Sequence, residues 1–451
     1  MIPISKTTRR IIMKKILLTI LILGSFVAAQ DINKPKLDKL FNLLLENQEG
    51  MGSISIFQDG QEIYQNTIGY ASIKENIKAD KNTKYRIGSI TKTFTAAMIM
   101  QLIEEGKLSL GTKLSEFYPK ITNAERITIE QLLKHRSGIY NFTDSSQYKT
   151  WMEKEISKQD LIKQIITDGS IFEPDTTAKY SNSNYVLLSF IAEDIENKTY
   201  AEIIKERIFK PCNLQNTFYG SKIEPKNNQA LSYNKLVDWE LATETDMSVP
   251  VGAGAIISTP TDLNIFLNCL FSYQLVSKDS LDKMSEIQEG FNFGMGLFEA
   301  SFDGKKALGH SGGIDGFGSN AFYFPKERFS LAYISNGIAY PLNDILIGVL
   351  SIYLDKDYQL PTFAPAIALK SEDLDKYLGL YSGPSLPLKI TISKDGNTLI
   401  AQATGQASFA LEAVEENIFV FRMAKIEMEF SPEEAKMLFR QAGKEFELAR
   451  E

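Results

Sequence analysis

The sequence contains few of the residues that bind metals or form cross-links. Its 451 residues include two histidines, His135 and His310, and two cysteines, Cys212 and Cys269. These four side chains do not have the spacing of a zinc site, so we expect neither a metal nor another cofactor. The cysteines lie far apart in apolar segments, a context that favours two buried thiols, with a disulfide as the less favoured alternative.

The sequence also lacks an excess of positive charge. It has 49 Lys and Arg residues against 56 Asp and Glu residues, which gives a net charge of −7. Proteins that bind nucleic acids need a basic surface to meet the phosphates, so we do not expect a nucleic-acid partner. The composition, 43% hydrophobic and 23% charged, is ordinary for a globular protein, and the length suits two or three domains.

The apolar run near the N-terminus is too short for a comfortable transmembrane helix. This run, residues 16–27, follows the basic residues 14–15 and leads into the small residues 27–29. Such an order is typical of a signal peptide, which we expect to cover residues 1–29 and to be removed on export. We therefore expect a secreted or periplasmic protein with no membrane span in the mature chain. An uncleaved anchor is the alternative, and Met13 is an alternative start.

A serine and a lysine lie three positions apart, at Ser89 and Lys92, where a helix is predicted to begin. Residues i and i+3 share one face of a helix, so the Lys92 amine can reach the Ser89 hydroxyl. A hydroxyl becomes a strong nucleophile when a nearby base removes its proton, and an uncharged, half-buried lysine is such a base. The alternative role for Ser89 is an N-cap.

The same Ser-x-x-Lys spacing recurs at residues 146–149, 232–235 and 280–283, in polar segments typical of a solvated surface. By contrast, residues 94–103 after the Ser89 copy are apolar nearly all round a helix, which predicts a buried helix. A lysine at the start of a buried helix needs polar partners. The surroundings, rather than the spacing, therefore favour Ser89 as the nucleophile.

Two further short motifs carry polar groups. Tyr180 and Asn182 form a Tyr-x-Asn triplet in a predicted loop before an apolar helix at residues 183–197. Loops between helices often present functional groups, whereas a second such triplet, at residues 64–66, lies in a predicted strand. Residues 310–313, His-Ser-Gly-Gly, stand just before a predicted run of strands, where glycines would let a substrate approach the backbone.

Hydrophobic periodicity predicts a mixed α/β fold. Two alternating runs around Asp59-Gly60 predict a β-hairpin, and residues 110–247 have mostly helical patterns. Strands return at residues 318–324 and 330–335, before an apolar helix at residues 342–354. This order suits a sheet flanked by helices with an inserted helical domain.

The pattern of the sequence changes after a predicted linker at residues 359–373. Several segments between residues 374 and 451 alternate apolar and polar residues at period two, with a turn at Asp395-Gly396. We therefore predict a main domain at residues 30–358 and a small C-terminal all-β domain at residues 374–451, folded as a barrel or a curled sheet.

Together, the three motifs resemble those of the serine β-lactamase and penicillin-binding-protein superfamily. Within it, the chain is similar to the branch of class C β-lactamases, DD-peptidases and esterases, where Ser-x-x-Lys is followed by Tyr-x-Asn and by Lys-Thr-Gly or His-x-Gly. Residues 85–89, 132–139 and 252–259 also match this branch, and the resemblance covers residues 35–355. It implies an antiparallel sheet flanked by helices with an inserted helical domain. The C-terminal part is similar to small β domains that are often appended to these hydrolases.

The resemblance implies a serine hydrolase in which Ser89 attacks a carbonyl group and forms an acyl-enzyme. Lys92 and Tyr180 would share the proton transfer. Lys92 would favour a partly ionised Tyr180 phenol, which would accept the serine proton and later activate water.

The resemblance also implies a set of substrate-binding residues. Asn182 would hold Lys92 and the substrate amide, and the backbone N–H groups of Ser89 and Gly313 would form an oxyanion hole. The third motif would contribute His310, Ser311, Gly312 and Gly313 to this substrate-binding and oxyanion region.

His310 stands where true β-lactamases have a lysine. A lysine is a permanent cation for a substrate carboxylate, whereas a histidine with a pKa of about 6.5 is only partly charged at neutral pH. We therefore expect an exported hydrolase that cleaves an amide or ester in a small-molecule or peptide substrate, such as an ester, a D-amino-acid amide or a cell-wall-like peptide. The alternatives are a class C-like β-lactamase and a non-catalytic protein that binds cell-wall peptides.

Three other residues are expected to have no catalytic role. His135 is predicted to brace a helix end. Asn141 and Asn197 begin Asn-x-Thr sequons, which have no meaning for a bacterial protein.

Overall fold

The computed structural model describes residues 32–235 and 238–451. The predicted signal peptide, residues 1–29, lies outside this range. Within the described residues, no helix combines the length and the apolar character that crossing a membrane requires.

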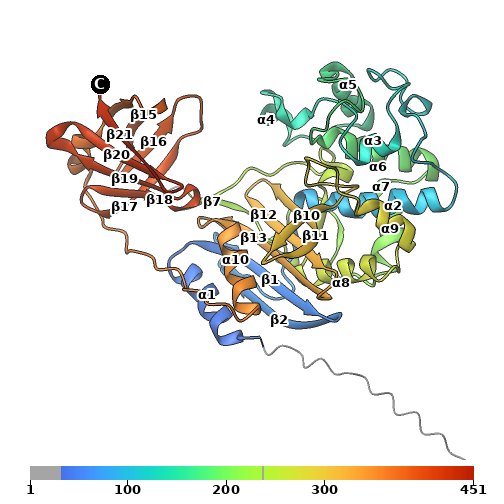
Figure 1. Cartoon of the computed structure of the whole chain (residues 1–451), viewed down its shortest axis with the longest axis horizontal. Coiled ribbons are helices and arrows are strands. Elements are labelled where there is room, and N and C mark those ends of the chain that lie inside the picture. Colours follow the sequence, from blue (N-terminus) through green and yellow to red (C-terminus); the bar gives the residue numbers. More distant parts are fainter. Residues whose placement is uncertain (1–31, 236–237) are drawn as a thin grey trace, which may run out of the picture. The chain divides into compact units, whose positions relative to one another are not determined.

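A large antiparallel sheet forms the centre of the main domain (Figure 1). Its strand order is β10 (Phe298–Phe302), β11 (Lys305–Ile314), β12 (Phe317–Phe324), β13 (Phe329–Ile338), β1 (Gly50–Gln58) and β2 (Gln61–Ile68). Two short strands extend it, β7 (Tyr233–Lys235) beside β13 and β8 (Trp239–Leu241) beside β7. The turn between β1 and β2 contains Asp59 and Gly60, both with positive φ, as the predicted hairpin requires.

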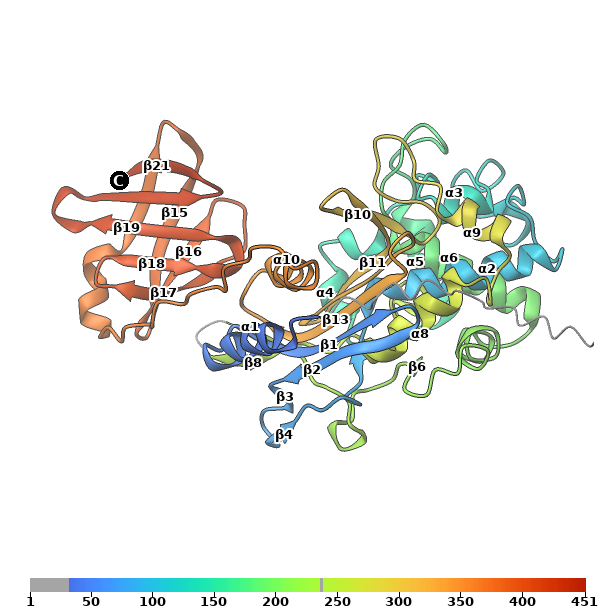
Figure 2. The same ribbon diagram turned by 60° about the horizontal axis from the view of Figure 1, so that its bottom comes forward.

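Both faces of this sheet are covered by helices (Figure 2). Successive side chains of a strand point to opposite faces, and in β13 Leu331 and Tyr333 pack with one hydrophobic core while Ala332 and Ile334 pack with another. The first core includes the helices α1 (Lys34–Glu46) and α10 (Leu342–Tyr353). The second includes α8 (Pro260–Phe271), and the short helix α9 (Lys278–Met284) follows it.

The predicted helical insertion lies between the short strands β5 (Tyr85–Arg86) and β9 (Ile256–Ser258). These two strands pair with each other, and β9 also pairs with β6 (Phe218–Tyr219). Its helices are α2 (Thr91–Glu104), α3 (Ile129–Leu133), α4 (Tyr148–Trp151), α5 (Lys158–Asp168), α6 (Asn182–Glu196) and α7 (Tyr200–Ile204). The chain continues from α7 as a π-helical turn over Lys205–Phe209. A separate two-stranded sheet pairs β3 (Tyr70–Ser72) with β4 (Ile77–Lys78).

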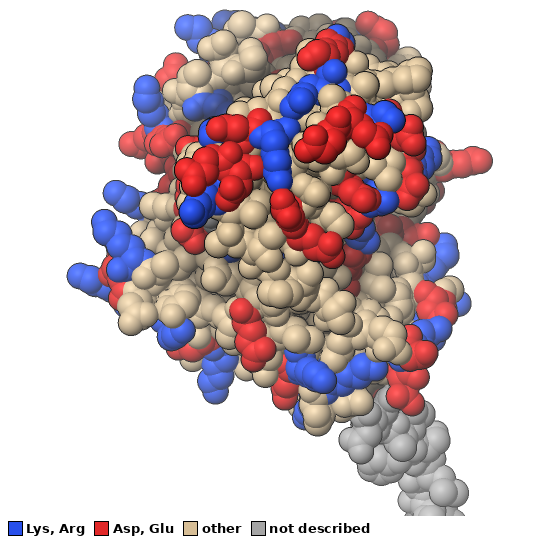
Figure 3. All heavy atoms as spheres, turned by 90° about the vertical axis from the view of Figure 1, so that its left-hand side faces the viewer, with Lys and Arg blue, Asp and Glu red and all other residues tan. Residues whose placement is uncertain are grey.

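The C-terminal part of the chain is a closed β-barrel with its own core. Its strands are β14 (Gly379–Gly383), β15 (Leu386–Asp395), β16 (Thr398–Ala403), β17 (Phe409–Glu415), β18 (Ile418–Phe421), β19 (Ile426–Ser431), β20 (Lys436–Gln441) and β21 (Lys444–Arg450). Polar partners line up across neighbouring strands, as where Arg440 binds Glu427, Glu429 and Glu445. In the view of Figure 3, basic side chains likewise lie among acidic ones.

The predicted mixed α/β fold with an additional all-β domain is confirmed. The third motif is placed differently from the prediction. His310 and the three residues after it lie inside β11, not ahead of the strands, because the strand pairing already begins at Lys305. The glycine content of this segment hid the strand, since glycine has a low β propensity.

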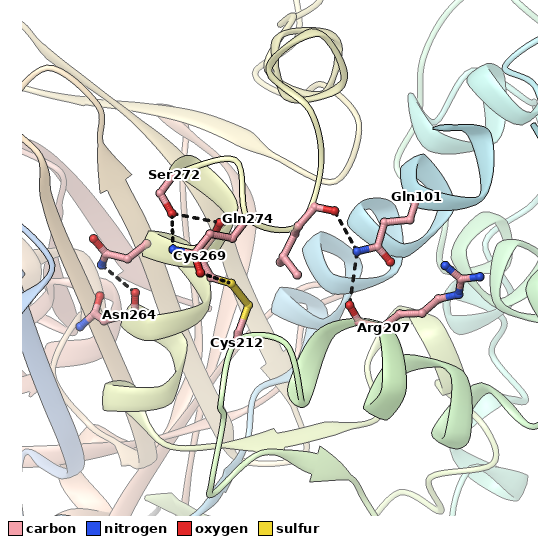
Figure 4. The surroundings of a disulfide bond; sticks show 9 residues. Gln101, Arg207, Cys212, Asn264, Cys269, Ser272 and Gln274 are labelled. Atoms are coloured by element: carbon pink, nitrogen blue, oxygen red, sulfur yellow. Dashed lines mark hydrogen bonds between the residues drawn. A yellow bond between two sulfur atoms is a disulfide. The ribbon is translucent and has the colours of Figure 1, made fainter. Parts of the chain in front are cut away.

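The two cysteines form a disulfide, so the expectation of two free thiols is wrong. Cys212 lies just after the π-helical turn, and Cys269 lies in the last turn of α8 (Figure 4). Sequence spacing gave no signal for this bond, because it is the packing of α8 against the end of the helical insertion that brings the cysteines together. The sulfur of Cys269 also lies 3.7 Å from the Gln274 side-chain oxygen.

We predict that this disulfide stabilises the main domain. It closes a loop with a sequence separation of 57 residues, and such a cross-link typically contributes about 2–4 kcal/mol by restricting the unfolded chain. The double variant Cys212→Ser/Cys269→Ser should therefore unfold at lower denaturant concentration than the wild type. Thiol titration of the denatured, non-reduced wild type is the control. Two free thiols in that titration would contradict the bond.

Candidate active site

Ser89 lies in a single turn of 3-10 helix, η1 (Gly88–Ile90), directly before α2. Its side chain is partly exposed, whereas both neighbours are buried. Gly88 has a φ of +50°, and a Cβ at this position would lie 2.9 Å from the backbone of Gly313. A glycine is therefore required for two reasons, the left-handed backbone and the close approach of β11.

Lys92 is in the first turn of α2 and has no exposed surface. Its Nζ lies 2.9 Å from the Ser89 Oγ, 2.7 Å from the Asn182 Oδ1 and 2.7 Å from the Ala253 carbonyl oxygen. Burial lowers the pKa of this amine well below its ordinary value. The expected lysine–serine contact is thus present, and the lysine is more deeply buried than the sequence suggested.

Asn182 is the first residue of α6, and two neighbours fix it in place. Its backbone N–H donates to Oδ1 of Asn141 at 2.9 Å, and its Nδ2 donates to the Thr143 hydroxyl at 3.0 Å. From the sequence, Asn141 and Thr143 are recognisable only as part of a sequon without meaning for a bacterial protein. Both instead orient the amide that contacts Lys92.

Tyr180 lies in the loop before α6, with its ring against those of His135 and His310 at 4.5 and 6.3 Å. The Lys92 Nζ is 4.9 Å from the centre of this ring. Burial raises the pKa of Tyr180, and a hydrogen bond with Ser89 offsets only part of that effect. The structure therefore favours a neutral phenol in place of the partly ionised one that was expected.

His135 directly follows the C-cap of α3 and adopts a positive φ of 55°. Its Nδ1 accepts a hydrogen bond from the backbone N–H of Ser181 at 3.2 Å. Burial is the main cause that keeps the pKa of this imidazole well below its ordinary value. The residue therefore ends a helix and also supports the loop that carries Tyr180, a contact that its sequence position did not reveal.

His310 is 3% exposed, with its ring 4.5 Å from that of Phe298. Its Nδ1 lies 2.5 Å from the Ser311 carbonyl oxygen. Burial is the main cause that lowers the pKa of His310 to about 3. The expectation of a partly charged imidazole at neutral pH is therefore wrong. The reference pKa applies to a solvated ring, and this ring is enclosed by aromatic side chains.

The remaining residues of the third motif run beside the segment that carries the nucleophile. Ser311 and Gly313 are exposed, while a Cβ on Gly312 would lie 2.1 Å from the carbonyl oxygen of Ile87. Ser319 on β12 donates a hydrogen bond to that same carbonyl at 2.8 Å. The three motifs of the sequence are thus brought together from η1, the loop before α6 and β11. Over the described residues, no group of histidine, cysteine or acidic side chains is arranged to hold a metal ion.

A serine hydroxyl in contact with a buried lysine amine, on a sheet flanked by helices, suits the chemistry of a serine hydrolase. The family model described as Beta-lactamase matches residues 37–342. The chain therefore belongs to the β-lactamase family, and it is an enzyme of the serine hydrolase class.

The chain is also similar in sequence to characterised proteins. Penicillin-binding protein 4* of Bacillus subtilis (strain 168) is 27% identical over 431 residues, which cover 88% of this chain and 94% of that protein. The teichoic acid D-alanine hydrolase of Staphylococcus aureus (strain MRSA252) is 28% identical over 247 residues, 54% of this chain and 59% of its own length.

Solved structures share the fold. The D-amino acid amidase from Ochrobactrum anthropi SV3, complexed with D-phenylalanine, has a TM-score of 0.65 and 24% identity over 71% of this chain and 99% of its own. The octameric penicillin-binding protein homologue from Pyrococcus abyssi has a TM-score of 0.65 and 24% identity over 92% of this chain and all of its own. The latter likeness extends beyond the residues that the family model matches.

We predict that the buried, uncharged His310 makes the folded protein less stable in acid. Between pH 6.5 and about pH 3 the imidazole takes up a proton in the unfolded chain but not in the folded one. The free energy of unfolding should therefore fall by about 1.4 kcal/mol per pH unit in this window as the pH is lowered. Urea unfolding of His310→Gln from pH 7 to pH 4 should show a correspondingly shallower fall. Equal slopes for wild type and variant would contradict the buried neutral ring.

Proposed function

We propose that this chain is an exported serine hydrolase that cleaves an amide or an ester through an acyl-enzyme on Ser89. The observation that carries the proposal is the buried amine of Lys92, 2.9 Å from the Ser89 Oγ. The catalytic residues of the proposal are Ser89, Lys92 and Tyr180.

The bonds of Lys92 support its role as the base. An uncharged amine has two N–H groups and one lone pair. The Ala253 carbonyl and the Asn182 Oδ1, both at 2.7 Å, are acceptors and take the two N–H groups. In that state the lone pair can accept the proton of the Ser89 hydroxyl, the reverse of the Nζ-to-Oγ direction that a charged amine would use. Burial of the amine favours the uncharged state, because the oxygens around it accept hydrogen bonds but supply no negative charge.

In the proposed acylation step, Oγ of Ser89 bonds to the carbonyl carbon of the substrate while its proton moves to Nζ of Lys92. The carbonyl electron pair moves to the oxygen, which accepts hydrogen bonds from the N–H groups of Ser89 and Gly313. When the tetrahedral adduct collapses, the bond to the leaving group breaks. The leaving amine or alcohol takes a proton from the Tyr180 hydroxyl, which regains it from Lys92.

Deacylation uses the same groups in reverse. A water molecule bonds to the ester carbon and gives one proton to Tyr180, whose own proton passes to Lys92. Oγ then leaves with that proton from Lys92. A neutral Tyr180 suits a relay of this kind, because its raised pKa keeps the hydroxyl proton in place until a stronger base is present.

The lack of positive charge on His310, in the third motif, favours substrates whose binding does not depend on a carboxylate. An uncharged, buried His310 offers no cation to a negative group. Among the similar proteins are a teichoic acid D-alanine hydrolase and a D-amino acid amidase, whose names describe hydrolysis at D-alanine on teichoic acid and at a D-amino acid amide. We accordingly propose D-aminoacyl esters, D-amino-acid amides and cell-wall-like peptides as substrates.

Export and the domain boundaries are also proposals. The disulfide supports export, since such bonds persist mainly in oxidising compartments. The separate core of the barrel supports a hydrolase domain at residues 30–358, a linker at residues 359–373 and a β domain at residues 374–451.

We predict that a fluorophosphonate probe adds its mass to Ser89. Intact-mass and peptide mass spectrometry of the wild type should show one adduct, on the peptide that contains Ser89. Ser89→Ala should show none, and Ser146→Ala, which removes the exposed serine of another Ser-x-x-Lys motif, should label like the wild type. An unlabelled wild type that retains cell-wall peptide binding would support the non-catalytic alternative and refute the proposal.

We predict faster turnover of an uncharged ester than of a β-lactam. With no cation at position 310, kcat/KM for p-nitrophenyl acetate should exceed that for nitrocefin, whose carboxylate gains no partner there. His310→Lys should narrow the difference by raising activity on nitrocefin. Efficient nitrocefin turnover by the wild type would favour the β-lactamase alternative.

A further inference from the structure

A buried ion pair joins the strand before Ser89 to the turn after Gly313. The side chains of Arg86, the last residue of β5, and of Asp315 are both 1% exposed. Nη1 of Arg86 lies 2.8 Å from Oδ2 of Asp315. The other oxygen of that carboxylate, Oδ1, accepts from the backbone N–H of Thr245 at 3.0 Å and from its hydroxyl at 2.7 Å. Both oxygens of Asp315 are therefore held by fixed donors.

The other partners of Arg86 lie elsewhere in the chain. Nη1 also donates to the Thr245 carbonyl at 2.7 Å, and Nη2 donates to the Ser221 carbonyl at 3.1 Å and to Glu244 at 2.8 Å. Of these partners, Asp315 is the one that belongs to the β11–β12 hairpin. It is therefore the link through which Arg86 holds the strand that carries Gly313.

This pair spans both donors of the proposed oxyanion hole. Arg86 is three residues before Ser89, and Asp315 is two residues after Gly313. Between these two residues, the backbones of Gly88 and Gly313 come into close contact, because a Cβ on Gly88 would lie 2.9 Å from the Gly313 nitrogen. Side chains therefore cannot interlock at the point of closest approach. The relative position of the two N–H groups therefore depends on contacts that flank this point. The ion pair of Arg86 and Asp315 is a charged contact of this kind.

We propose that Arg86 and Asp315 are positioning residues that hold the N–H groups of Ser89 and Gly313 at the spacing an oxyanion requires. Neither residue touches the substrate in this role. The inference depends on the proposed function, because it assigns those two N–H groups to an oxyanion. Such donors act only when they lie about 2.7–3.1 Å from the developing charge, so a small shift of β11 against η1 weakens both.

The chain offers a matched pair of variants. Asp315→Asn and Glu244→Gln each replace a carboxylate by an amide of the same shape. Arg86 faces these two carboxylates, so each variant leaves one positive and one negative charge at the cluster. The two carboxylates differ in exposure, 29% for Glu244 against 1% for Asp315, and only Asp315→Asn weakens the link to the hairpin of Gly313.

We predict that Asp315→Asn lowers the single-turnover rate of acylation by p-nitrophenyl acetate about 10- to 100-fold, less than the loss of a whole oxyanion donor. Glu244→Gln should stay within about twofold of the wild type, as expected for a change outside the site. Affinity for a boronic acid, whose adduct on Ser89 resembles the tetrahedral intermediate, should fall with the rate in Asp315→Asn. The KM for the ester should change little in both variants.

The outcomes separate this inference from the proposed function. A wild type that does not acylate Ser89 overturns the proposed function. A wild type that acylates, together with an Asp315→Asn variant that retains boronic acid affinity and rate, overturns the positioning role alone. The melting temperature of each variant is measured first, and every assay is run at a temperature at which that variant is folded. If Asp315→Asn does not fold, Arg86→Lys tests the same link, because a lysine cannot bind Asp315 and the Thr245 carbonyl with one planar group.

Discussion

The proposed chemistry depends on keeping one amine uncharged inside the protein. Within the described part of the chain, Lys92 contacts no acidic side chain, and its hydrogen-bond partners are an amide oxygen, a carbonyl and a hydroxyl. These neutral groups satisfy its hydrogen bonds without supplying the negative charge that would keep it protonated. The same enclosure lowers the pKa of His135 and of His310, so the site as a whole disfavours positive charge.

Much of the fold was predictable from periodicity. Local hydrophobic patterns with periods of two and 3.6 residues predict the hairpin around Asp59-Gly60, the helix α2 and the strands β12 and β13. The strand β11 around His310 was harder to predict, because its glycines give it a low β propensity. Those glycines allow close backbone contact with η1, and this contact joins segments more than 200 residues apart in the sequence.

The site was only partly predictable, and the reason is physical. Residue types and spacing placed Ser89 beside Lys92, since both lie within one helical turn. The electrostatic state of Tyr180 and His310 depends on enclosure by residues from other elements, such as Phe298, and a linear sequence does not show that enclosure. The link from Arg86 to Asp315 and the disulfide are likewise products of tertiary packing.

The Asn141 sequon has a consequence for how the protein is produced. The Asn141 side chain is 6% exposed, and its oxygen is bound to the start of α6. In a yeast or mammalian secretion host, a sugar chain attached to this asparagine during synthesis would have no space beside α6 once the domain folds. Asn197, exposed at the far end of the same helix, would accept a glycan without this conflict. A bacterial host, or a host that lacks N-glycosylation, therefore suits preparation of the native protein.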